Sequence, residues 1–206
     1  MPEVEFRPED LLRVLARHGV RHVLIGGFAG VIHGSPYVTT DIDVVPDPTA
    51  ANLERLSAAL EELHARVWTE SEPSGVPFDH DATSLASSRM WSLVTDAGRL
   101  DIAFEPSGTT GFADVARDAV HLSIMGAEVD VASLADVIRS KEAAGRQKDR
   151  LVLPVLRRIL EETERASVRE TEPWRTTSSS PTGSAPRSPV STAWPRSRCS
   201  EASVTR

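Results

Sequence analysis

The stretch that decides the fold is Ile25–Asp47, IGGFAGVIHGSPYVTTDIDVVPD, which begins with a glycine pair and ends in an acidic, β-branched segment. The pair is Gly26-Gly27, and the acidic segment carries Asp41 and Asp43 with one residue between them. Side chains at positions i and i+2 of a strand project from the same face. We therefore predict that this acidic segment is a strand whose two carboxylates share one face.

Two carboxylates on one strand face repel each other unless a cation lies between them. Mg²⁺ is the natural partner, because it is a hard ion that binds oxygen ligands and shares them with substrate phosphates. A third carboxylate, Asp101, lies in the apolar segment LDIAF, within a hairpin predicted over residues 90–95 and 99–104. If its strand neighbours that of Asp41 and Asp43, the three carboxylates can hold two Mg²⁺ ions and drive a displacement at phosphorus.

The glycine pair lies between a strand predicted at residues 22–25 and a short helix predicted at residues 28–33. Glycine lets the backbone approach a phosphate closely, and the free N–H groups of a helix N-terminus attract anions. Gly26 and Gly27 are therefore expected to cradle the phosphates of a nucleotide. Thr39 starts the predicted strand, residues 39–45, and projects from the same face as the two aspartates.

A run of cations in the C-terminal third supplies candidates for the outer phosphates. The segment SLADVIRSKEAAGRQKDR predicts a helix with Ser133 as its N-cap, followed by a helix over residues 146–165 that Pro154 should kink or break. Such a charge run usually marks a solvated helix face. Beside a nucleotide site, however, Lys141 and Lys148 become candidates for contacts to the β- and γ-phosphates.

The composition narrows the class of protein. A net charge of −7 over 206 residues argues against broad, sequence-independent DNA binding, which needs an excess of Lys and Arg. The single cysteine excludes a disulfide framework and a cysteine metal site. The longest apolar run is far shorter than a membrane span, and the N-terminus has no signal-peptide pattern. We expect a soluble, cytoplasmic protein with no membrane partner.

From about residue 170 onward the chain is rich in Ser, Thr, Pro and Arg and poor in aliphatic residues, so it cannot bury enough apolar surface to fold. We predict a catalytic domain over residues 1–132, a C-terminal helical region over 133–168 and a disordered tail over 169–206. The fold class is α+β, with a mixed β-sheet flanked by helices. The other expected elements are helices over 8–17 and 50–65, a long loop over 70–88 and a small hairpin over 121–125 and 128–131.

These residues resemble the nucleotidyltransferase superfamily of the DNA polymerase β type, in particular the small bacterial members related to abortive-infection and toxin–antitoxin systems. The family pattern is a Gly-Gly or Gly-Ser turn, a short helix, Asp-x-Asp on the next strand and a third carboxylate on a later strand. The resemblance covers residues 8–165. The matching residues are Gly26-Gly27, Asp41-Ile42-Asp43 and Asp101.

Many relatives carry His-Gly followed by Arg-x-Thr-x-Asp-x-Asp. This chain has His33-Gly34 and Thr39 at the matching positions, but Tyr37 stands where arginine is common. The position therefore does not offer the guanidinium group that relatives carry. The segment around Lys141 also resembles the helical end of these proteins.

The resemblance implies an enzyme that uses Mg²⁺ to transfer a nucleoside monophosphate from a nucleoside triphosphate to an acceptor hydroxyl. The acceptor could be a protein side chain, a tRNA 3′ end or a small molecule, and a cognate toxin or antitoxin protein could be a partner. One alternative, motivated by Tyr37, is a binding module of a toxin–antitoxin pair with little or no catalysis. Another is an antibiotic-modifying nucleotidyltransferase, for which the region after Ser133 looks too short.

Plainer interpretations of the same residues remain open from sequence. Asp41 and Asp43 also suit an exposed edge strand, where charge discourages aggregation. Asp96 competes with Asp101 as the third carboxylate, although its place before Ala-Gly is typical of a turn. Trp68 is expected in the core.

Overall fold

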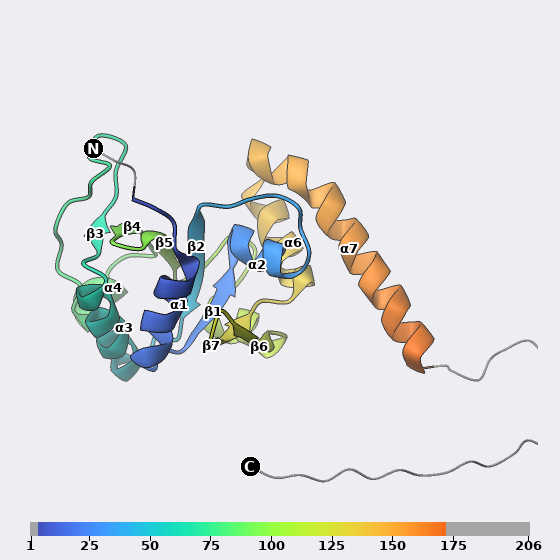
Figure 1. Cartoon of the computed structure of the whole chain (residues 1–206), viewed down its shortest axis with the longest axis horizontal. Coiled ribbons are helices and arrows are strands. Elements are labelled where there is room, and N and C mark those ends of the chain that lie inside the picture. The colour runs from blue at the N-terminus through green and yellow to red at the C-terminus, as the bar shows by residue number, and fades with distance from the viewer. Residues whose placement is uncertain (1–3, 172–206) are drawn as a thin grey trace, which may run out of the picture. The chain divides into compact units, whose positions relative to one another are not determined.

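The computed structural model describes residues 4–171, with side chains as far as residue 168 (Figure 1). The chain divides into two units, and the first, Met1–Thr171, contains every described residue. The predicted tail, residues 169–206, lies outside the described residues except for the helix that ends at Thr171. No described helix combines the length and the apolar character that crossing a membrane requires.

Seven strands of the described chain form one mixed sheet in the order β3-β4-β5-β2-β1-β7-β6 (Figure 1). Strand β2 lies inside this sheet, because it pairs in parallel with β5 on one side and antiparallel with β1 on the other. Strand β1 in turn pairs in parallel with β7. The strands are β1 (His22–Ile25), β2 (Asp41–Pro46), β3 (Arg66–Val67), β4 (Met90–Thr95), β5 (Gly98–Ala103), β6 (Val120–Ile124) and β7 (Ala127–Val131).

The helices of the described residues complete an α+β fold, as predicted. Helices α1 and α3 contact each other, and α2 contacts β1, β2 and α6. Helix α6 also contacts α7, which runs beyond the rest of this unit (Figure 1). The helices are α1 (Pro8–Arg17), α2 (Gly26–Ile32), α3 (Ala50–Glu62), α4 (Ala82–Ala86), α5 (Phe112–Arg117), α6 (Leu134–Ala144) and α7 (Gln147–Thr171).

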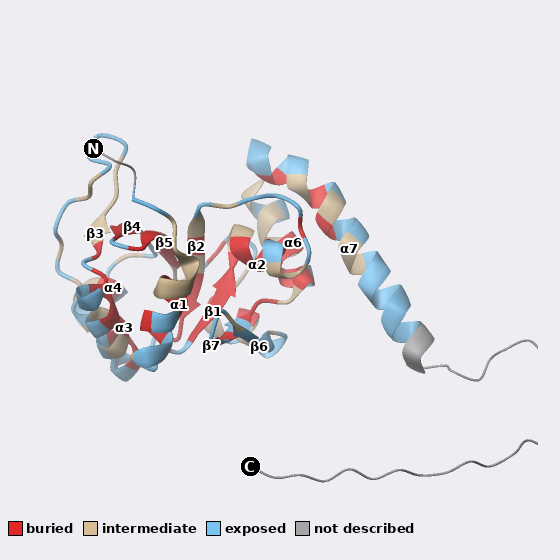
Figure 2. Ribbon diagram, viewed as in Figure 1, coloured by how far each residue is buried: buried red, intermediate tan, exposed pale blue. Residues whose placement is uncertain are grey.

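Alternation along β2 fixes which side chains reach the site. Ile42 and Val44 are at most 1% exposed, whereas Asp41 and Asp43 are only partly buried on the opposite face. Fully burying an aliphatic side chain of this size contributes roughly 1.5–3 kcal/mol. A slip of one residue would exchange the two faces, so burial of the aliphatic pair holds the aspartates in place. The buried residues fill the sheet and the inner helix faces (Figure 2).

The structure differs from the sequence prediction at several boundaries. Strand β2 begins at Asp41, so Thr39 lies in the preceding loop. Helix α7 continues through Pro154, because buried Leu153 and Leu156 hold that turn against the core and offset the roughly 3 kcal/mol cost of an internal proline. The predicted loop over 70–88 contains the short helix α4. Strand β3 and helix α5 were also not predicted.

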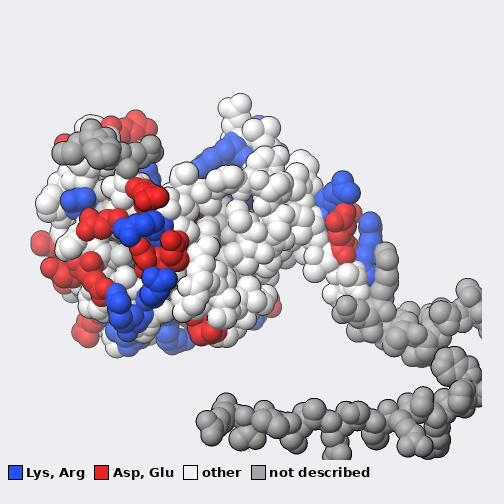
Figure 3. Space-filling model, in the orientation of Figure 1, with Lys and Arg blue, Asp and Glu red and all other residues white. Residues whose placement is uncertain are grey.

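The distribution of charge on the visible surface is mixed. Figure 3 shows acidic and basic side chains interspersed over the region of α1 and α3. Ion pairs explain part of this pattern, because Arg7 and Arg13 both bind Asp10 on α1. Exposed pairs of this kind contribute at most about 1 kcal/mol each. They mark a solvated face rather than a binding site.

Candidate active site

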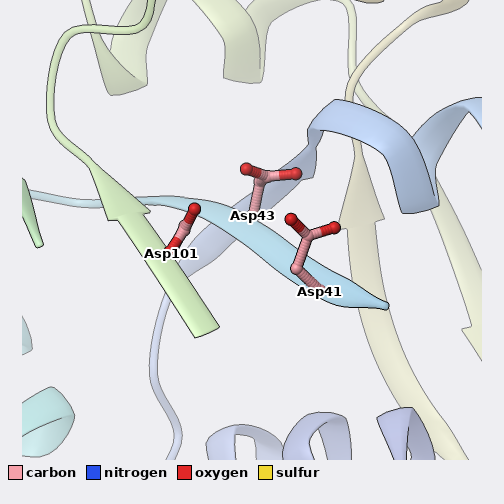
Figure 4. A group of neighbouring side chains, drawn as sticks. All are labelled: Asp41, Asp43 and Asp101. Carbon is pink, nitrogen blue, oxygen red and sulfur yellow. The ribbon is translucent and has the colours of Figure 1, made fainter. Parts of the chain in front are cut away.

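The sheet order brings the three predicted carboxylates together. In the registers of β2 with β1 and β5, Asp43 is opposite Ile25 on one side and Asp101 on the other. Asp41 lies two residues before Asp43 and points to the same side (Figure 4). One carboxylate oxygen from each of the three aspartates lies within 4.8 Å of the others. β2 is an interior strand, so its acids are not the charges of an exposed edge.

Burial and mutual repulsion disfavour the charged forms of this group. Burial, then the charges of Asp41 and Asp101, raise the pKa of Asp43 to about 7. Burial also raises the pKa of Asp101, and this is partly opposed by Arg99 and Ser92. A bound cation would reverse both effects, because it favours the ionised carboxylates.

The donor set fits a hard divalent cation. Oδ1 of Asp101 is buried and accepts no hydrogen bond from the described residues. Nη2 of Arg99 lies 3.7 Å from this oxygen, beyond hydrogen-bond distance. A buried carboxylate oxygen without a hydrogen bond is costly, and a bound cation would satisfy it. Three carboxylates at this spacing are the oxygen ligands that Mg²⁺ or Mn²⁺ prefers. Asp41, Asp43 and Asp101 can therefore hold a metal ion between them.

The glycine pair lies directly against these carboxylates. Gly26 has φ of +71°, and a β-carbon there would lie 1.9 Å from Oδ2 of Asp43. The backbone N–H of Gly27 donates to the same oxygen at 3.4 Å. A β-carbon on Gly27 would lie 2.9 Å from Oγ1 of Thr39. Both glycines are also the first residues of α2, rather than a turn that precedes the helix as the sequence predicted.

Thr39 is part of the site although it lies outside the strand. Its hydroxyl donates a hydrogen bond to Oδ1 of Asp41. The bond fixes one oxygen of Asp41 and leaves the other free for a ligand. Thr39 therefore lies between Gly27 and the carboxylate of Asp41.

Of the two lysines predicted to bind phosphate, the structure connects only Lys141 with the carboxylates. Burial raises the pKa of Asp43, and the positive charge of Lys141 acts in the opposite direction. The lysine therefore interacts electrostatically with this carboxylate. Its Nζ donates to Oδ1 of Asp149 at 3.2 Å, and the side chains are 16% and 3% exposed. Lys148 is exposed, and within the described part of the chain its side chain makes no hydrogen bond or ion pair. The sequence prediction missed Asp149, which stood within the charged run.

Arg99 and Trp68 lie on the β5 side of the carboxylates, whereas the glycine pair lies on the β1 side. Nη2 of Arg99 lies 3.7 Å from Oδ1 of Asp101, and its guanidinium carbon lies 3.8 Å from the centre of the Trp68 ring. Trp68 is only partly buried, which contradicts its predicted place in the core. Arg99 could have been found from sequence, because it stands two residues before Asp101 and so shares its strand face.

Two other predicted positions lie outside the site. Tyr37, which stands where arginine is common in the resembled family, donates through its hydroxyl to the backbone carbonyl of Leu151 on α7 at 3.4 Å. Asp96 is exposed in the turn between β4 and β5 and bonds to His64 at 2.7 Å. Asp96 is therefore the turn residue, and Asp101 is the third carboxylate of the site.

Comparison with known proteins identifies solved structures that have a similar fold. No protein family matches the sequence, and no curated protein matches it. Among solved structures, lincomycin-bound LnuA, a lincosamide antibiotic adenylyltransferase, superposes with a TM-score of 0.51 at 15% identity, over 76% of this chain and 99% of LnuA. The chain has a nucleotidyltransferase fold. The resemblance seen in the sequence is thus confirmed at the level of the fold.

Two further solved structures are similar at lower scores. The antibiotic-resistance factor ANT(2″)-Ia gives a TM-score of 0.49 at 16% identity, over 81% of this chain and 91% of that chain. The same protein in complex with adenylyl-2″-tobramycin gives 0.47 at 17% identity, over 78% and 94%. The superposition on LnuA therefore spans almost the whole length of that structure.

Proposed function

We propose that the protein is a Mg²⁺-dependent nucleotidyltransferase that transfers a nucleoside monophosphate from a nucleoside triphosphate to an acceptor hydroxyl. The single observation that carries the proposal is the convergence of Asp41, Asp43 and Asp101 within 4.8 Å, directly against the bare backbone of Gly26. Binding of the metal and binding of the phosphates are thus assigned to adjacent groups. The nucleotidyltransferase fold supports the same reaction class.

The three aspartates would hold the metal, which supplies Lewis-acid stabilisation of the charge that develops on the phosphoryl oxygens. Gly26 and Gly27 would border the triphosphate, since their lack of side chains lets it approach Asp43. Lys141 would neutralise charge on the outer phosphates. The protein's own contribution is therefore positioning and electrostatic stabilisation, as is typical of phosphoryl chemistry.

In the reaction, the acceptor oxygen forms a bond to the α-phosphorus as the bond from that phosphorus to the bridging oxygen breaks. Pyrophosphate leaves with the bridging oxygen, and the hydroxyl proton passes to Asp101. The glycine pair lies beyond β2 on the β1 side, whereas Asp101 lies on β5. An in-line displacement places the attacking and leaving oxygens on opposite sides of phosphorus, so the acceptor would enter from the β5 side.

Two further candidate functions are each supported by one observation. The similarity to LnuA, a lincosamide antibiotic adenylyltransferase, favours a small-molecule acceptor as one of them. The other is a module with a nucleotidyltransferase fold that binds a toxin or antitoxin partner without catalysis. Tyr37 supports the module, because it bonds to Leu151 instead of offering a cation to a triphosphate.

The test is label transfer from each of the four α-³²P nucleoside triphosphates, with Mg²⁺, to a panel of protein, RNA and antibiotic acceptors in cell extract. We expect transfer by the wild type, and its loss in a folded protein that carries both Asp41→Asn and Asp43→Asn. Asp79→Asn is the matched control, because Asp79 is an exposed aspartate outside the site. Unchanged transfer by the double variant would refute the assignment. Absence of transfer alongside tight binding to a neighbouring gene's product would favour the module.

A further inference from the structure

The two edges of the sheet differ in how they are protected. At one edge, β3 has only two residues, and Val67 bonds through its backbone to Val76 on the outer side. At the other edge, β6 pairs with β7 (Figure 1), and no other strand of residues 4–171 pairs with it. Natural sheets protect a long edge with Lys, Pro, an inward charge or a bulge. The sequence of β6, VHLSI, contains no Lys, Pro or acidic residue, and its register has no bulge.

The turn after β6 determines which backbone groups face outward at this edge. It has two residues, whose φ angles of +52° and +81° are typical of a type I′ hairpin turn. The residues that flank such a turn, Ile124 and Ala127, form a hydrogen-bonded pair. Hydrogen-bonded and non-hydrogen-bonded pairs alternate along an antiparallel ladder. The N–H and C=O groups of His121 and Ser123 therefore point away from β7, toward the open edge.

One face of β6 is apolar and incompletely covered. Val120, Leu122 and Ile124 lie opposite three buried apolar residues of β7, so they share the face of the core. Leu122 and Ile124 pack against the core but are only partly buried, and Val120 is 44% exposed. The hydrophobic layer of the protein therefore reaches this edge and remains open there.

The other face of β6 is polar and exposed. Nδ1 of His121 lies 2.7 Å from Oδ1 of Asp130, and its Nε2 lies 3.2 Å from Oε2 of Glu128. Ser123 is opposite Glu128 in the register. All four side chains belong to exposed residues. A strand that pairs with β6 must therefore alternate in the same way, with apolar residues on the core face and polar residues on the other.

A second copy of β6 meets this requirement when it pairs antiparallel about a two-fold axis at Leu122. His121 is then opposite Ser123 of the second copy, so the outward backbone groups of both residues meet in hydrogen-bonded pairs. On the core face Leu122 is opposite its own copy, and Val120 is opposite Ile124. The apolar layer then continues from one copy into the other without a polar interruption.

The charges of the polar face also suit a second copy. In this register a row of residues runs from Asp130 through His121 to Ser123 and then Glu128 of the second copy. The basic side chain of each row therefore lies between acidic ones, and no two acidic residues are directly opposite each other at the new pairing. Such an isologous contact is the usual arrangement in dimers of one chain.

We propose that the outer edge of β6 is a homodimer interface, at which the β6 strands of two copies pair antiparallel and join their sheets into one. The inference is independent of the proposed function, because β1 and β7 separate this edge from the carboxylates on β2 and β5. A strand of five residues buries less surface than the roughly 1,600 Å² of a standard interface. We therefore expect a dissociation constant of about 1–100 µM.

Analytical ultracentrifugation of the full chain, from about 1 µM to 1 mM, tests the dimer. Ser123→Pro removes an outward N–H from each copy, and proline is tolerated at an edge position whose N–H is not used by the neighbouring strand. The substitution should raise the dissociation constant of the dimer about tenfold or more, since two backbone hydrogen bonds are lost. Ser123→Ala is the matched control, because it keeps the N–H and should dimerise as the wild type does.

Cross-linking tests the register and decides the matter if thermal unfolding shows that Ser123→Pro is not folded. Cys199 is the single cysteine, so the variants are made in a Cys199→Ser background. Leu122→Cys places two thiols opposite each other across the two-fold axis, where a Cα separation of about 4.5 Å suits a disulfide. Ser123→Cys is the control, because its two copies are diagonal neighbours at about 7–8 Å. Oxidation by copper phenanthroline should cross-link the first variant far faster than the second.

Three results would overturn the proposal. A wild type that stays monomeric at about 1 mM excludes the dimer. In that monomer, protection of the His121 and Ser123 amides from hydrogen exchange would assign the edge to another segment of the chain, and rapid exchange would leave it for a different protein. A dimer that persists unchanged in folded Ser123→Pro, or that cross-links equally through positions 122 and 123, would place the interface elsewhere.

Discussion

A β-carbon on residue 26 would lie 1.9 Å from Oδ2 of Asp43, so Gly26 and Asp43 fit together only because the glycine has no side chain. The contact joins the start of α2 to the middle of β2. Its physical consequence is that the bare backbone and the carboxylate occupy one small volume, where a metal-bound phosphate can contact both.

Gly26→Ala should therefore abolish nucleotide transfer and destabilise the protein. The alanine is strained at φ of +71°, at a cost of roughly 1–2 kcal/mol, and it also displaces the carboxylate of Asp43. Denaturant unfolding and label transfer measure the two effects. Gly34→Ala is the matched control, because Gly34 has φ of +99° and a β-carbon at that position would have nothing within 4 Å. If both variants behave alike, strain alone explains the result and the contact with Asp43 is unimportant.

Asp43→Asn should stabilise the metal-free protein at alkaline pH. The pKa of Asp43 rises from its usual 3.8 to about 7 in the folded state, chiefly through burial. Between these values the folded protein holds a proton that the unfolded chain has released, so stability falls as pH rises through this window. At about 1.4 kcal/mol per unit, removing the charge gains up to about 4 kcal/mol at pH 8 and almost nothing at pH 4.

Unfolding in EDTA at both pH values measures this gain. Asp79→Asn, in an exposed loop, should show no comparable dependence on pH. Saturating Mg²⁺ should reverse the order, because the ion stabilises only the protein that binds it. A variant Asp43→Asn that is less stable than wild type at pH 8 without metal would contradict the repulsion described for the three carboxylates.

The ion pair of Lys141 with buried Asp149 predicts that the two residues act as one unit. Lys141→Met and Asp149→Asn should each weaken binding of a non-hydrolysable nucleoside triphosphate with Mg²⁺ by about tenfold. Together they should cost little more than either alone, since Asp149 acts by holding the lysine. Lys148→Met is the control and should bind nucleotide as the wild type does. Additive losses in the double variant would show that Asp149 has a separate role.

The sequence was sufficient for the parts of the site that depend on local pattern. Alternation of apolar and polar residues predicted that Asp41 and Asp43 share a face, and the hairpin pattern placed Asp101 on a strand. The pairing of β2 with β5 joins two segments that are far apart in the sequence. No local pattern specifies the register of such a pairing. The resemblance to nucleotidyltransferases supplied that expectation, and the geometry agrees with it.

Other features escaped prediction for physical reasons. Glycine is a poor helix former, so the sequence placed Gly26 before α2 rather than within it. Charged runs usually mark solvated faces, which hid the difference between Lys141 and Lys148. That difference depends on burial against Asp149, and only the packing of α6 on α7 reveals it.

The most direct test is calorimetric titration of Mg²⁺ or Mn²⁺ into the wild type and into three single variants, Asp41→Asn, Asp43→Asn and Asp101→Asn. Asp79→Asn is the control. The shared site predicts that each of the three variants weakens metal binding about tenfold or more, while the control binds as the wild type does. If Asp101→Asn binds the ion as tightly as the wild type, the third carboxylate is not a ligand and the proposed enzyme site is wrong.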